Sequence, residues 1–368
     1  MAIVRFLKKY TVFCIAMIAA VVTCFFIPPD AEYISYFDFK TLACLFLTLL
    51  VICALRNISF FTIVARKLVL LSGTLRGLFL MLMTITFVGS MLIANDMALI
   101  TFLPLGYFAL STVKKERYMA YLFIIQNIAA NLGGMLTPFG NPQNLYLYSF
   151  FNIPTDEFCS IMLPPFVLAV SLLVVACLLV KNEKLLLEDQ YSKKLDIKKT
   201  IIYSALFMFA IAIVFRLVPF VIGLVVISAV MLFVDKEAFC MVDYALLGTF
   251  FFFFIFAGNL SRIDAVNQIM SELLTKDTFI SSVLSCQVIS NVPSAILLSQ
   301  FTTNYKALLL GVNIGGTGTL IASLASLITF SEYRVLYPGH SKQYFWLFTA
   351  INFAFLIVMT VVTKLFWV

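Results

Sequence analysis

Two short polar stretches with the same pattern interrupt apolar parts of the chain. Residues 131–134 read NLGG and residues 313–316 read NIGG, and a threonine follows each asparagine by six positions, at Thr137 and Thr319. A membrane helix that carries asparagine, paired glycines and threonine is expected to break there and to present free backbone groups to a solute. Freed carbonyls suit a hard cation, and the N-terminus of the next half-helix suits an anion. The pattern is typical of a transporter.

Two further polar tips lie inside apolar segments, one with Asn95 and Asp96 and one with Ser290 and Asn291. An ionised aspartate at the bilayer centre costs roughly 2.5–3.5 kcal/mol, so Asp96 needs a partner, a bound cation or a proton. Asp96 is therefore the best single candidate for ion coupling. The alternative is a tip close enough to a wet cavity to need no partner. The asparagines can serve as solute ligands, as helix caps, or as both.

The first of the two breaks is unusually polar. Residues 137–144 read TPFGNPQN, with two prolines and three amide side chains. Glycine, serine and threonine also mediate close helix packing in lipid, and that alternative explains Ser323 and Ser326 well. It explains the 137–144 run poorly, because two prolines would disrupt a helix without any gain in packing.

The composition indicates an integral membrane protein. Of 368 residues, 62% are hydrophobic and 12% are charged, and the mean hydropathy is +1.05. Spanning the hydrocarbon takes roughly 20 apolar residues in a helix, and the chain offers many such runs rather than short alternating strands. Residues 10–28 are long enough to span and lack a convincing cleavage site, so we expect them to form the first helix. The fold class is all-α.

The sequence offers little for an enzyme or a metal centre. The eight cysteines are scattered without CxxC pairs, and His340 is the single histidine, so neither a histidine-based metal site nor a catalytic triad is expected. No GxxxxGK[ST] motif occurs, which argues against ATP hydrolysis. We expect no enzyme and no cofactor other than sodium ions, and coupling to an ion gradient is the remaining energy source.

The hydrophobic runs predict nine crossings, two of them interrupted. Residues 75–111 and 277–304 each have an apolar half, a polar tip and a second apolar half, so we predict re-entrant hairpins there. The crossings are expected at 10–28, 38–55, 117–152 (interrupted), 160–181, 199–215, 217–235, 243–260, 305–331 (interrupted) and 341–366.

The basic residues follow this topology. Nineteen of the 25 Lys and Arg residues fall on one side of it, which the positive-inside rule identifies as the cytoplasmic side of a cell membrane. The N-terminus is then cytoplasmic and the C-terminus external. The net charge of +7 is explained by orientation and does not indicate a nucleic-acid partner.

The same order of elements occurs twice. Residues 1–181 and 217–368 each contain crossings, a hairpin, a broken helix and a closing helix, and residues 182–216 provide a cytoplasmic linker and a connecting helix. Because an odd helix lies between them, the second part enters the membrane upside down. The sequence therefore predicts an inverted-repeat secondary transporter.

Four stretches resemble the ion transporter superfamily, specifically its citrate-transporter-like branch, which includes divalent-anion permeases, arsenite permeases and sodium/proton antiporters. They are ANDMALITFLPL at 94–105, NLGGMLTPFGNPQN at 131–144, SNVPSAILL at 290–298 and NIGGTGTLIASLASLITF at 313–330. Dicarboxylate members typically carry Ser-Asn-Thr at both tips, whereas this chain carries Ala-Asn-Asp and Ser-Asn-Val. The acidic first tip resembles the citrate, arsenite and antiporter members more closely.

The resemblance implies hairpin tips that meet near the midplane, sodium or proton sites beside each tip, a solute between them, and a dimer with a moving transport domain. The ion-binding residues it implies are Asn95, Asp96, Asn131, Gly134, Thr137, Ser290, Asn291, Asn313, Gly316 and Thr319. The solute-binding residues it implies are Asn95, Asn141, Gln143, Asn144, Asn291 and Thr317.

The sequence thus predicts an ion-coupled secondary transporter of a small anion, such as citrate or a dicarboxylate. Sodium/proton antiport or arsenite efflux is the first alternative, and a passive anion channel is the second. The expected partners are the anionic solute, sodium ions or protons, and the lipid bilayer.

Overall fold

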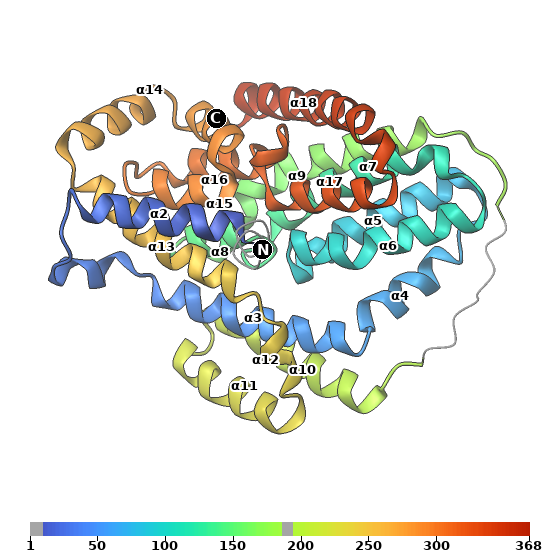
Figure 1. The fold of residues 1–368 in the computed structure, drawn as a ribbon, viewed down its shortest axis with the longest axis horizontal. Helices are drawn as coiled ribbons and strands as arrows, with labels where there is room; N and C mark the ends of the chain where they lie inside the picture. The colour runs from blue at the N-terminus through green and yellow to red at the C-terminus, as the bar shows by residue number, and fades with distance from the viewer. Residues whose placement is uncertain (1–9, 186–193) are drawn as a thin grey trace.

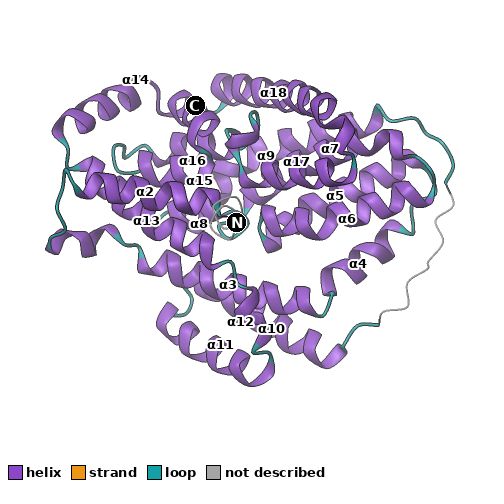
Figure 2. Cartoon of the chain, in the orientation of Figure 1, coloured by secondary structure: helices purple, strands orange, loops and turns teal. Residues whose placement is uncertain are grey.

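The structure is a computed structural model that describes residues 10–185 and 194–368. These residues form helices without any strand, and an isolated bridge pairs Thr74 with Lys184 (Figure 2). Helices satisfy their backbone hydrogen bonds internally, as lipid requires. By length and composition, seven helices of the described chain can cross a membrane: Phe39–Asn57, Leu75–Ile93, Glu116–Leu136, Thr155–Leu178, Ile197–Val214, Tyr244–Ser261 and Pro338–Phe366.

Among the described residues, the first part of the chain forms eight helices, and one connecting helix follows before the second part. In chain order they are α2 (Thr11–Cys24), α3 (Phe39–Asn57), α4 (Phe60–Val69), α5 (Leu75–Ile93), α6 (Asn95–Thr112), α7 (Met119–Gly133), α8 (Pro142–Phe150), α9 (Thr155–Leu178) and α10 (Ile197–Val214). Short 3-10 helices occupy Ala31–Tyr36 (η1), Glu116–Tyr118 (η2) and Gly134–Leu136 (η3).

The second part repeats much of this order. It contains α11 (Phe220–Val234), α12 (Glu237–Met241), α13 (Tyr244–Ser261), α14 (Asp264–Ile289), α15 (Asn291–Leu298), α16 (Tyr305–Ile314), α17 (Leu324–Leu336) and α18 (Ser341–Phe366), with 3-10 helices at Leu320–Ala322 (η4) and Pro338–His340 (η5). Helices α2 and α11 are shorter than the crossings predicted at 10–28 and 217–235.

Helix α14 bends at the position where the sequence predicts the second hairpin to begin. Asp277 has non-helical angles, φ −163° and ψ 94°, and its Oδ1 accepts the N–H of Ile280 at 3.0 Å. The aspartate therefore caps a new helical segment. That segment packs against α15, as α5 packs against α6.

Both stretches with the Asn-x-Gly-Gly pattern end a helix. Helix α7 ends at Gly133, and helical structure longer than one turn resumes only with α8 at Pro142. Helix α16 ends at Ile314, and α17 begins at Leu324. Proline at the start of α8 fits because the first helical N–H has no partner within the helix.

Helices from the two parts pack on one another in reciprocal pairs. Helix α2 packs on α13 while α11 packs on α3, and α8 packs on α15 while α17 packs on α6. Likewise α9 packs on α16 while α18 packs on α7. In Figure 1, α5 and α6 lie in the right half of the view, and α15 lies left of centre.

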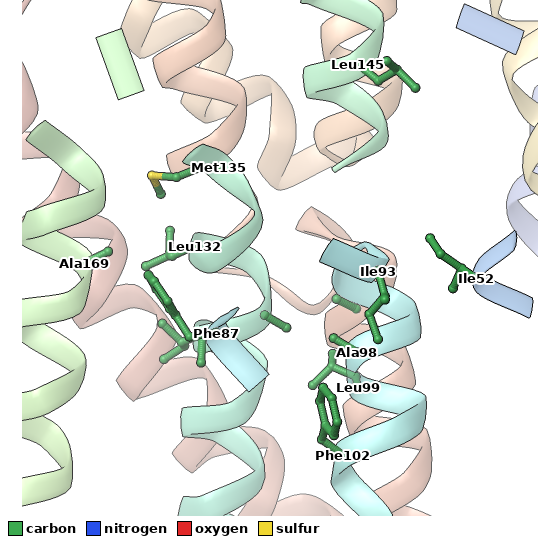
Figure 3. Packing of buried hydrophobic residues seen from close by; sticks show 14 of the residues in the cluster. Ile52, Phe87, Ile93, Ala98, Leu99, Phe102, Leu132, Met135, Leu145 and Ala169 are labelled. Atoms are coloured by element: carbon green, nitrogen blue, oxygen red, sulfur yellow. The ribbon is translucent and has the colours of Figure 1, made fainter. Parts of the chain in front are cut away.

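The first break rests on a well-packed apolar core. Figure 3 shows Leu132 and Met135 at the end of α7, with Phe87 of α5 beside Leu132 and Ala169 on α9 nearby. A Cβ at Gly133 would lie 2.4 Å from the Phe87 carbonyl oxygen, so only glycine lets α7 approach α5 this closely. The core positions the polar residues that follow the break.

Candidate functional site

The two helix pairs turn in the same backbone conformation. Ala94, between α5 and α6, has φ 64° and ψ 153°, and Ser290, between α14 and α15, has φ 76° and ψ 158°. Each turn residue accepts the first bond of the next helix, from Ala98 N at 3.0 Å and from Ser294 N at 3.1 Å. Residues other than glycine rarely adopt these backbone angles, so both turns contain local strain.

An asparagine follows each turn and is the first residue of the helix that begins there. Asn95 Oδ1 accepts the N–H of Asp96 at 3.0 Å, and Asn291 Oδ1 accepts the N–H of Val292 at 2.9 Å. The N-cap positions belong to Ala94 and Ser290, which make no side-chain cap bond. Each asparagine therefore satisfies one free backbone N–H of its helix without occupying the N-cap position.

The two motif threonines tie each break to the neighbouring helix pair. Thr137 Oγ1 donates to the carbonyl of Met91 at 2.9 Å, and Thr319 Oγ1 donates to the carbonyl of Gln287 at 3.0 Å. Each carbonyl belongs to the third residue before its turn. The same contact thus occurs at equivalent places in the two parts of the chain.

Buried amide side chains connect the two breaks to each other. Asn95 Nδ2 donates to Asn131 Oδ1 at 3.2 Å, which joins the first tip to the first break. Asn141 Nδ2 donates to Asn313 Oδ1 at 3.4 Å, and Asn313 Nδ2 donates to Asn144 Oδ1 at 2.6 Å. These five side chains are at most 4% exposed. Asn141 Nδ2 also donates to the Asn131 carbonyl at 3.4 Å, so the two groups of side chains join in one amide network between the breaks.

The second glycine of each motif lies where these polar groups meet. A Cβ at Gly316 would lie 3.0 Å from Asn291 Nδ2 and 3.8 Å from Asn131 Oδ1, so Gly316 lies between the second tip and the first break. The carbonyl of Gly134 accepts from Asn144 Nδ2 at 3.1 Å. Both glycines therefore permit close approach of amide groups.

A cavity of about 280 Å³ lies between the two tips. Apolar side chains of α2 and α13 form much of its wall, and no lysine or arginine is among the described residues that line it. The polar residues that line this central cavity are Asn95, Asp96, Gln143, Thr249, Ser290, Asn291 and Ser323.

Two side chains of the central cavity have buried oxygens without a hydrogen-bond partner among the described residues. They are Asp96 Oδ1 and Gln143 Oε1, and Gln143 is 1% exposed. An unpaired buried polar atom costs about 1–3 kcal/mol. Such groups call for an explanation, and a ligand that enters the cavity would supply the missing partner.

The structure brings some of the predicted residues to the cavity and leaves others in the network. Asn95, Asp96, Gln143, Ser290 and Asn291 line the cavity. Three further residues of the predicted solute-binding set do not line it, namely Asn141, Asn144 and Thr317.

Each of those three residues has an internal partner. Thr317 Oγ1 donates to the Ile314 carbonyl at 2.7 Å, and Asn144 Nδ2 donates to the carbonyls of residues 134, 135 and 137 at 3.1–3.3 Å. Asn144 therefore holds the first break in shape, and Asn141 joins it to the second.

Gln287 has a similar role at the second break and was not expected from the sequence. Its Nε2 donates to the carbonyls of Gly315 at 2.8 Å and Thr317 at 3.1 Å, and its Oε1 accepts the N–H of Thr319 at 2.9 Å. The sequence signal that could have identified Gln287 is a glutamine inside an apolar half of the predicted hairpin.

Buried polar residues also extend the site towards α17 and α18. Asn127 Nδ2 donates to Ser326 Oγ and to Asn352 Oδ1, each at 3.3 Å. Ser323 Oγ accepts the N–H of Ala325 at 3.2 Å, and Ser323 lines the central cavity. The helix-packing explanation of Ser323 is therefore incomplete.

The described residues contain no group of three or more His, Cys, Asp or Glu side chains that could hold a metal ion. A cation at Asp96 would be held by one carboxylate together with neutral oxygens. Hard monovalent cations accept such oxygen ligands, and a proton needs only the carboxylate.

Comparisons with known proteins agree with this architecture. A family model described as "Citrate transporter" matches residues 1–306. An uncharacterized transporter of Methanocaldococcus jannaschii is 32% identical over 351 residues, which cover 92% of each chain. Inner membrane protein YbiR of Escherichia coli is 27% identical over 328 residues, which cover 86% of this chain and 87% of that protein.

Proposed function

Because this chain belongs to the citrate transporter family, we propose that it is a secondary transporter of a small anion, coupled to sodium ions or protons. The solute is a carboxylate such as citrate or a dicarboxylate, and it crosses the membrane by alternating access. The observation that carries this proposal is the cavity between the two tips, which combines an unpaired carboxylate with amide groups.

Asp96 is the coupling residue in this proposal. It lines the cavity, and its Oδ1 has no hydrogen-bond partner among the described residues. A lone carboxylate in an apolar surrounding binds a proton or a cation more favourably than it stays bare. Binding of the cation removes the negative charge that would repel an anionic solute.

The solute is held by groups that donate hydrogen bonds. Gln143, Ser290 and Asn291 line the cavity with amide or hydroxyl donors, and helices α6 and α15 begin at its edge. Helix N-termini present N–H groups and a positive dipole to an anion. The apolar walls from α2 and α13 limit the size of the solute and exclude bulk water.

The two parts of the chain are inverted repeats, and the two helix pairs are re-entrant hairpins from opposite membrane faces. Three observations support this. The turns at Ala94 and Ser290 have the same conformation, and Thr137 and Thr319 make the same contact. The helices of the two parts also pack in reciprocal pairs, as a twofold relation requires.

The transporter is a multi-pass membrane protein, and we place its N-terminus in the cytoplasm and its C-terminus outside the cell. The bias of nineteen of 25 basic residues to one side supports this orientation in the cytoplasmic membrane. The dimer implied by the family resemblance stays a prediction.

A test is uptake by purified protein in liposomes. Labelled citrate and succinate would be offered under an inward sodium gradient, an inward proton gradient, or neither. We expect saturable accumulation under one gradient that disappears when the gradient is collapsed, with protein-free liposomes as control. Absence of uptake for every solute under both gradients contradicts the proposal.

One observation favours a second candidate, which is sodium/proton antiport or arsenite efflux. The central cavity contains an acid and no basic side chain, as a site for cations or neutral solutes would. In that case sodium would drive proton movement without any carboxylate, and a trapped pH-sensitive dye would record it. Loss of that exchange in Asp96→Asn would identify the same coupling residue.

A further inference from the structure

Three cavities of the described chain share walls and lie in series. A vestibule of about 570 Å³ lies at the ends of α3 and α12 and the start of α13, and a small cavity of about 70 Å³ adjoins it. Met97, Ile100 and Asp243 line both the vestibule and the small cavity. Asp96 and Pro142 line both the small cavity and the central cavity. The small cavity therefore lies between the vestibule and the central cavity and shares lining residues with each.

Two acids stand at the two ends of the small cavity. Asp243 is shared with the vestibule, and Asp96 is shared with the central cavity. They are the only ionisable side chains among its lining residues, and the remaining polar one, Thr48, donates internally to the Cys44 carbonyl at 2.8 Å. Acids without basic neighbours attract cations and repel anions, most strongly inside low-dielectric walls.

The small cavity is large enough for a cation and too small for a carboxylate solute. Its volume of about 70 Å³ holds roughly two water molecules at ~30 Å³ each. A proton carried along water or a partly dehydrated sodium ion fits this space. A di- or tricarboxylate does not, whereas the central cavity is four times larger.

We propose that Asp243 and the vestibule form an access route by which a monovalent cation reaches Asp96 without passing through the solute cavity. The cation meets Asp243 first and then crosses the small cavity beside Met97. The proposal rests on the proposed function, because it takes Asp96 as the coupling acid. It adds Asp243 as a residue that sets the apparent affinity for the driving cation.

Among the described residues, few other charged and titratable groups lie around Asp243. In this part of the chain Arg56 is the one basic side chain that lines the vestibule, and its Nη1 lies 3.9 Å from the Met97 sulfur. Its positive charge beside the route opposes the arriving cation. The titratable groups that line the vestibule with Asp243 are Tyr10, Cys53, Arg56, Cys240 and Tyr244.

The test compares Asp243→Asn with Arg56→Gln in the full chain in liposomes. Asp243 Oδ1 caps α13 by accepting the N–H of Leu246 at 3.0 Å, and asparagine keeps that oxygen while it removes the charge. We expect the KM for the driving cation to rise roughly tenfold in Asp243→Asn and to fall in Arg56→Gln. Exchange of labelled citrate at equal cation concentrations on both sides is expected to stay within about twofold of wild type.

The matched control is Asp196→Asn. Asp196 caps α10 by accepting the N–H of Lys199 at 3.1 Å, is exposed, and lines none of the three cavities. It should leave both the cation KM and the exchange unchanged. Sodium and proton arms of the assay tell which cation uses the route.

The outcomes separate the two proposals. If wild type shows neither driven uptake nor exchange, the proposed function fails and the route falls with it. If wild type is active and Asp243→Asn keeps the wild-type KM for the cation, only the route is wrong. Loss of citrate exchange in a folded Asp243→Asn protein would place Asp243 on the solute path and also overturn the separate route.

Cys240 supplies a second measurement that does not depend on folding of a variant at Asp243. It lines the vestibule and is the exposed member of the free cysteines among the described residues. A trimethylammonium methanethiosulfonate reagent attached there should slow cation-driven uptake and spare citrate exchange. Cys240→Ser should abolish the effect, and inhibition that persists in Cys240→Ser would count against the route.

Discussion

The two tips have the same backbone and different chemistry. Both turn at a residue with positive φ, and both continue with an asparagine whose Oδ1 accepts the next backbone N–H. The residue after the asparagine is Asp96 at the first tip and Val292 at the second. The shared backbone geometry supports the proposed inverted repeat. The charge occurs once, so the proposed coupling acid has no counterpart at the second tip.

The two breaks also differ in the hydrogen bonds that their asparagines make. Asn131 accepts from Asn95, so the first break contacts its own tip, whereas Asn313 pairs with Asn141 and Asn144 of the other break. The first part therefore contributes the carboxylate and two of the three asparagines that hydrogen-bond across the two breaks. The second part contributes Thr249, Ser290, Asn291 and Ser323, which are four of the seven polar side chains that line the central cavity.

The largest expected effect is that of Asp96→Asn. The variant removes the charge and keeps the size, so gradient-driven uptake should fall about 100-fold, at the upper end of typical coupling energies. The equivalent change at the second tip, Val292→Asn, should stay within about threefold of wild type. Uptake by liposomes measures both. If the Asp96→Asn variant still accumulates the solute against its concentration gradient, the proposed difference between the two tips is wrong.

A smaller effect is expected from alanine at the second glycine of each motif. A Cβ at Gly134 would lie 2.4 Å from Asn141 Oδ1 and 2.8 Å from the Gly140 carbonyl, whereas one at Gly316 would lie 3.0 Å from Asn291 Nδ2. Gly134→Ala should lower the melting temperature in detergent by roughly 5 °C, and Gly316→Ala by about half as much.

Gly339→Ala is the control for both glycines, because nothing lies within 4 Å of a Cβ placed there. Its melting temperature should equal that of wild type. Equal losses in Gly134→Ala and Gly316→Ala would show that the two breaks are packed alike, contrary to the distances.

Glycine at the turns should stabilise the protein modestly. Ala94 and Ser290 adopt angles that favour glycine, so relief of strain in Ala94→Gly should add about 1 kcal/mol of stability. Ser290→Gly should add less, because it removes the bond from Ser290 Oγ to the Ala322 carbonyl at 3.3 Å. Thermal melting ranks the two variants, and a larger gain at Ser290 would contradict this order.

The smallest effects concern the contacts at the outer ends of the two helix pairs. Glu183 bonds Lys115 and lies 3.4 Å from Arg117, next to α6. Glu157 accepts from Tyr305 at 2.8 Å and lies 3.1 Å from Lys306, at the start of α16. Each contact is partly exposed, so Glu183→Gln and Glu157→Gln should each lower the melting temperature by roughly 1–2 °C.

The contact at Glu183 should also depend on pH. The bond from Lys115 lowers the pKa of Glu183 below its ordinary value of 4.5. The folded protein therefore gains stability above that ordinary value and loses it as pH falls through the lowered pKa. The difference between wild type and Glu183→Gln should be full at pH 7 and should shrink as the pH falls below 4.5 through the lowered pKa. A difference that persists in acid would contradict this explanation.

Local sequence signals predicted where helices stop. The prolines at 138 and 142, the paired glycines and the polar tips lie at interruptions in the structure, because proline lacks an N–H and glycine lacks a Cβ wherever they occur. Hydropathy alone could not separate a hairpin half from a crossing. Leu75–Ile93 is long and apolar enough to span a membrane, although the sequence analysis treats it as half of a hairpin.

Helix lengths and internal bends were predicted less well. Helix α2 ends at Cys24 and α11 begins only at Phe220, since apolar residues continue past the point where the backbone leaves the helix. The residues of the site were also predicted only in part. Asn95 and Asp96 were recognised as polar residues in an apolar segment and Gln143 as a member of the polar 137–144 run, and all three line the central cavity. Gln287 was overlooked although it is also a polar residue in an apolar segment.

The sequence by itself determined the membrane environment, the helical class, the two breaks and the single acid at the first tip, because each depends on residues adjacent along the chain. Only the tertiary structure decided that Asn141 reaches Asn313, that Gln287 holds the second break, and that Asp243 and Asp96 share the walls of one small cavity. Those pairings join residues between 32 and 172 positions apart in the chain. Their distances are set by how whole helices pack, which no local pattern encodes.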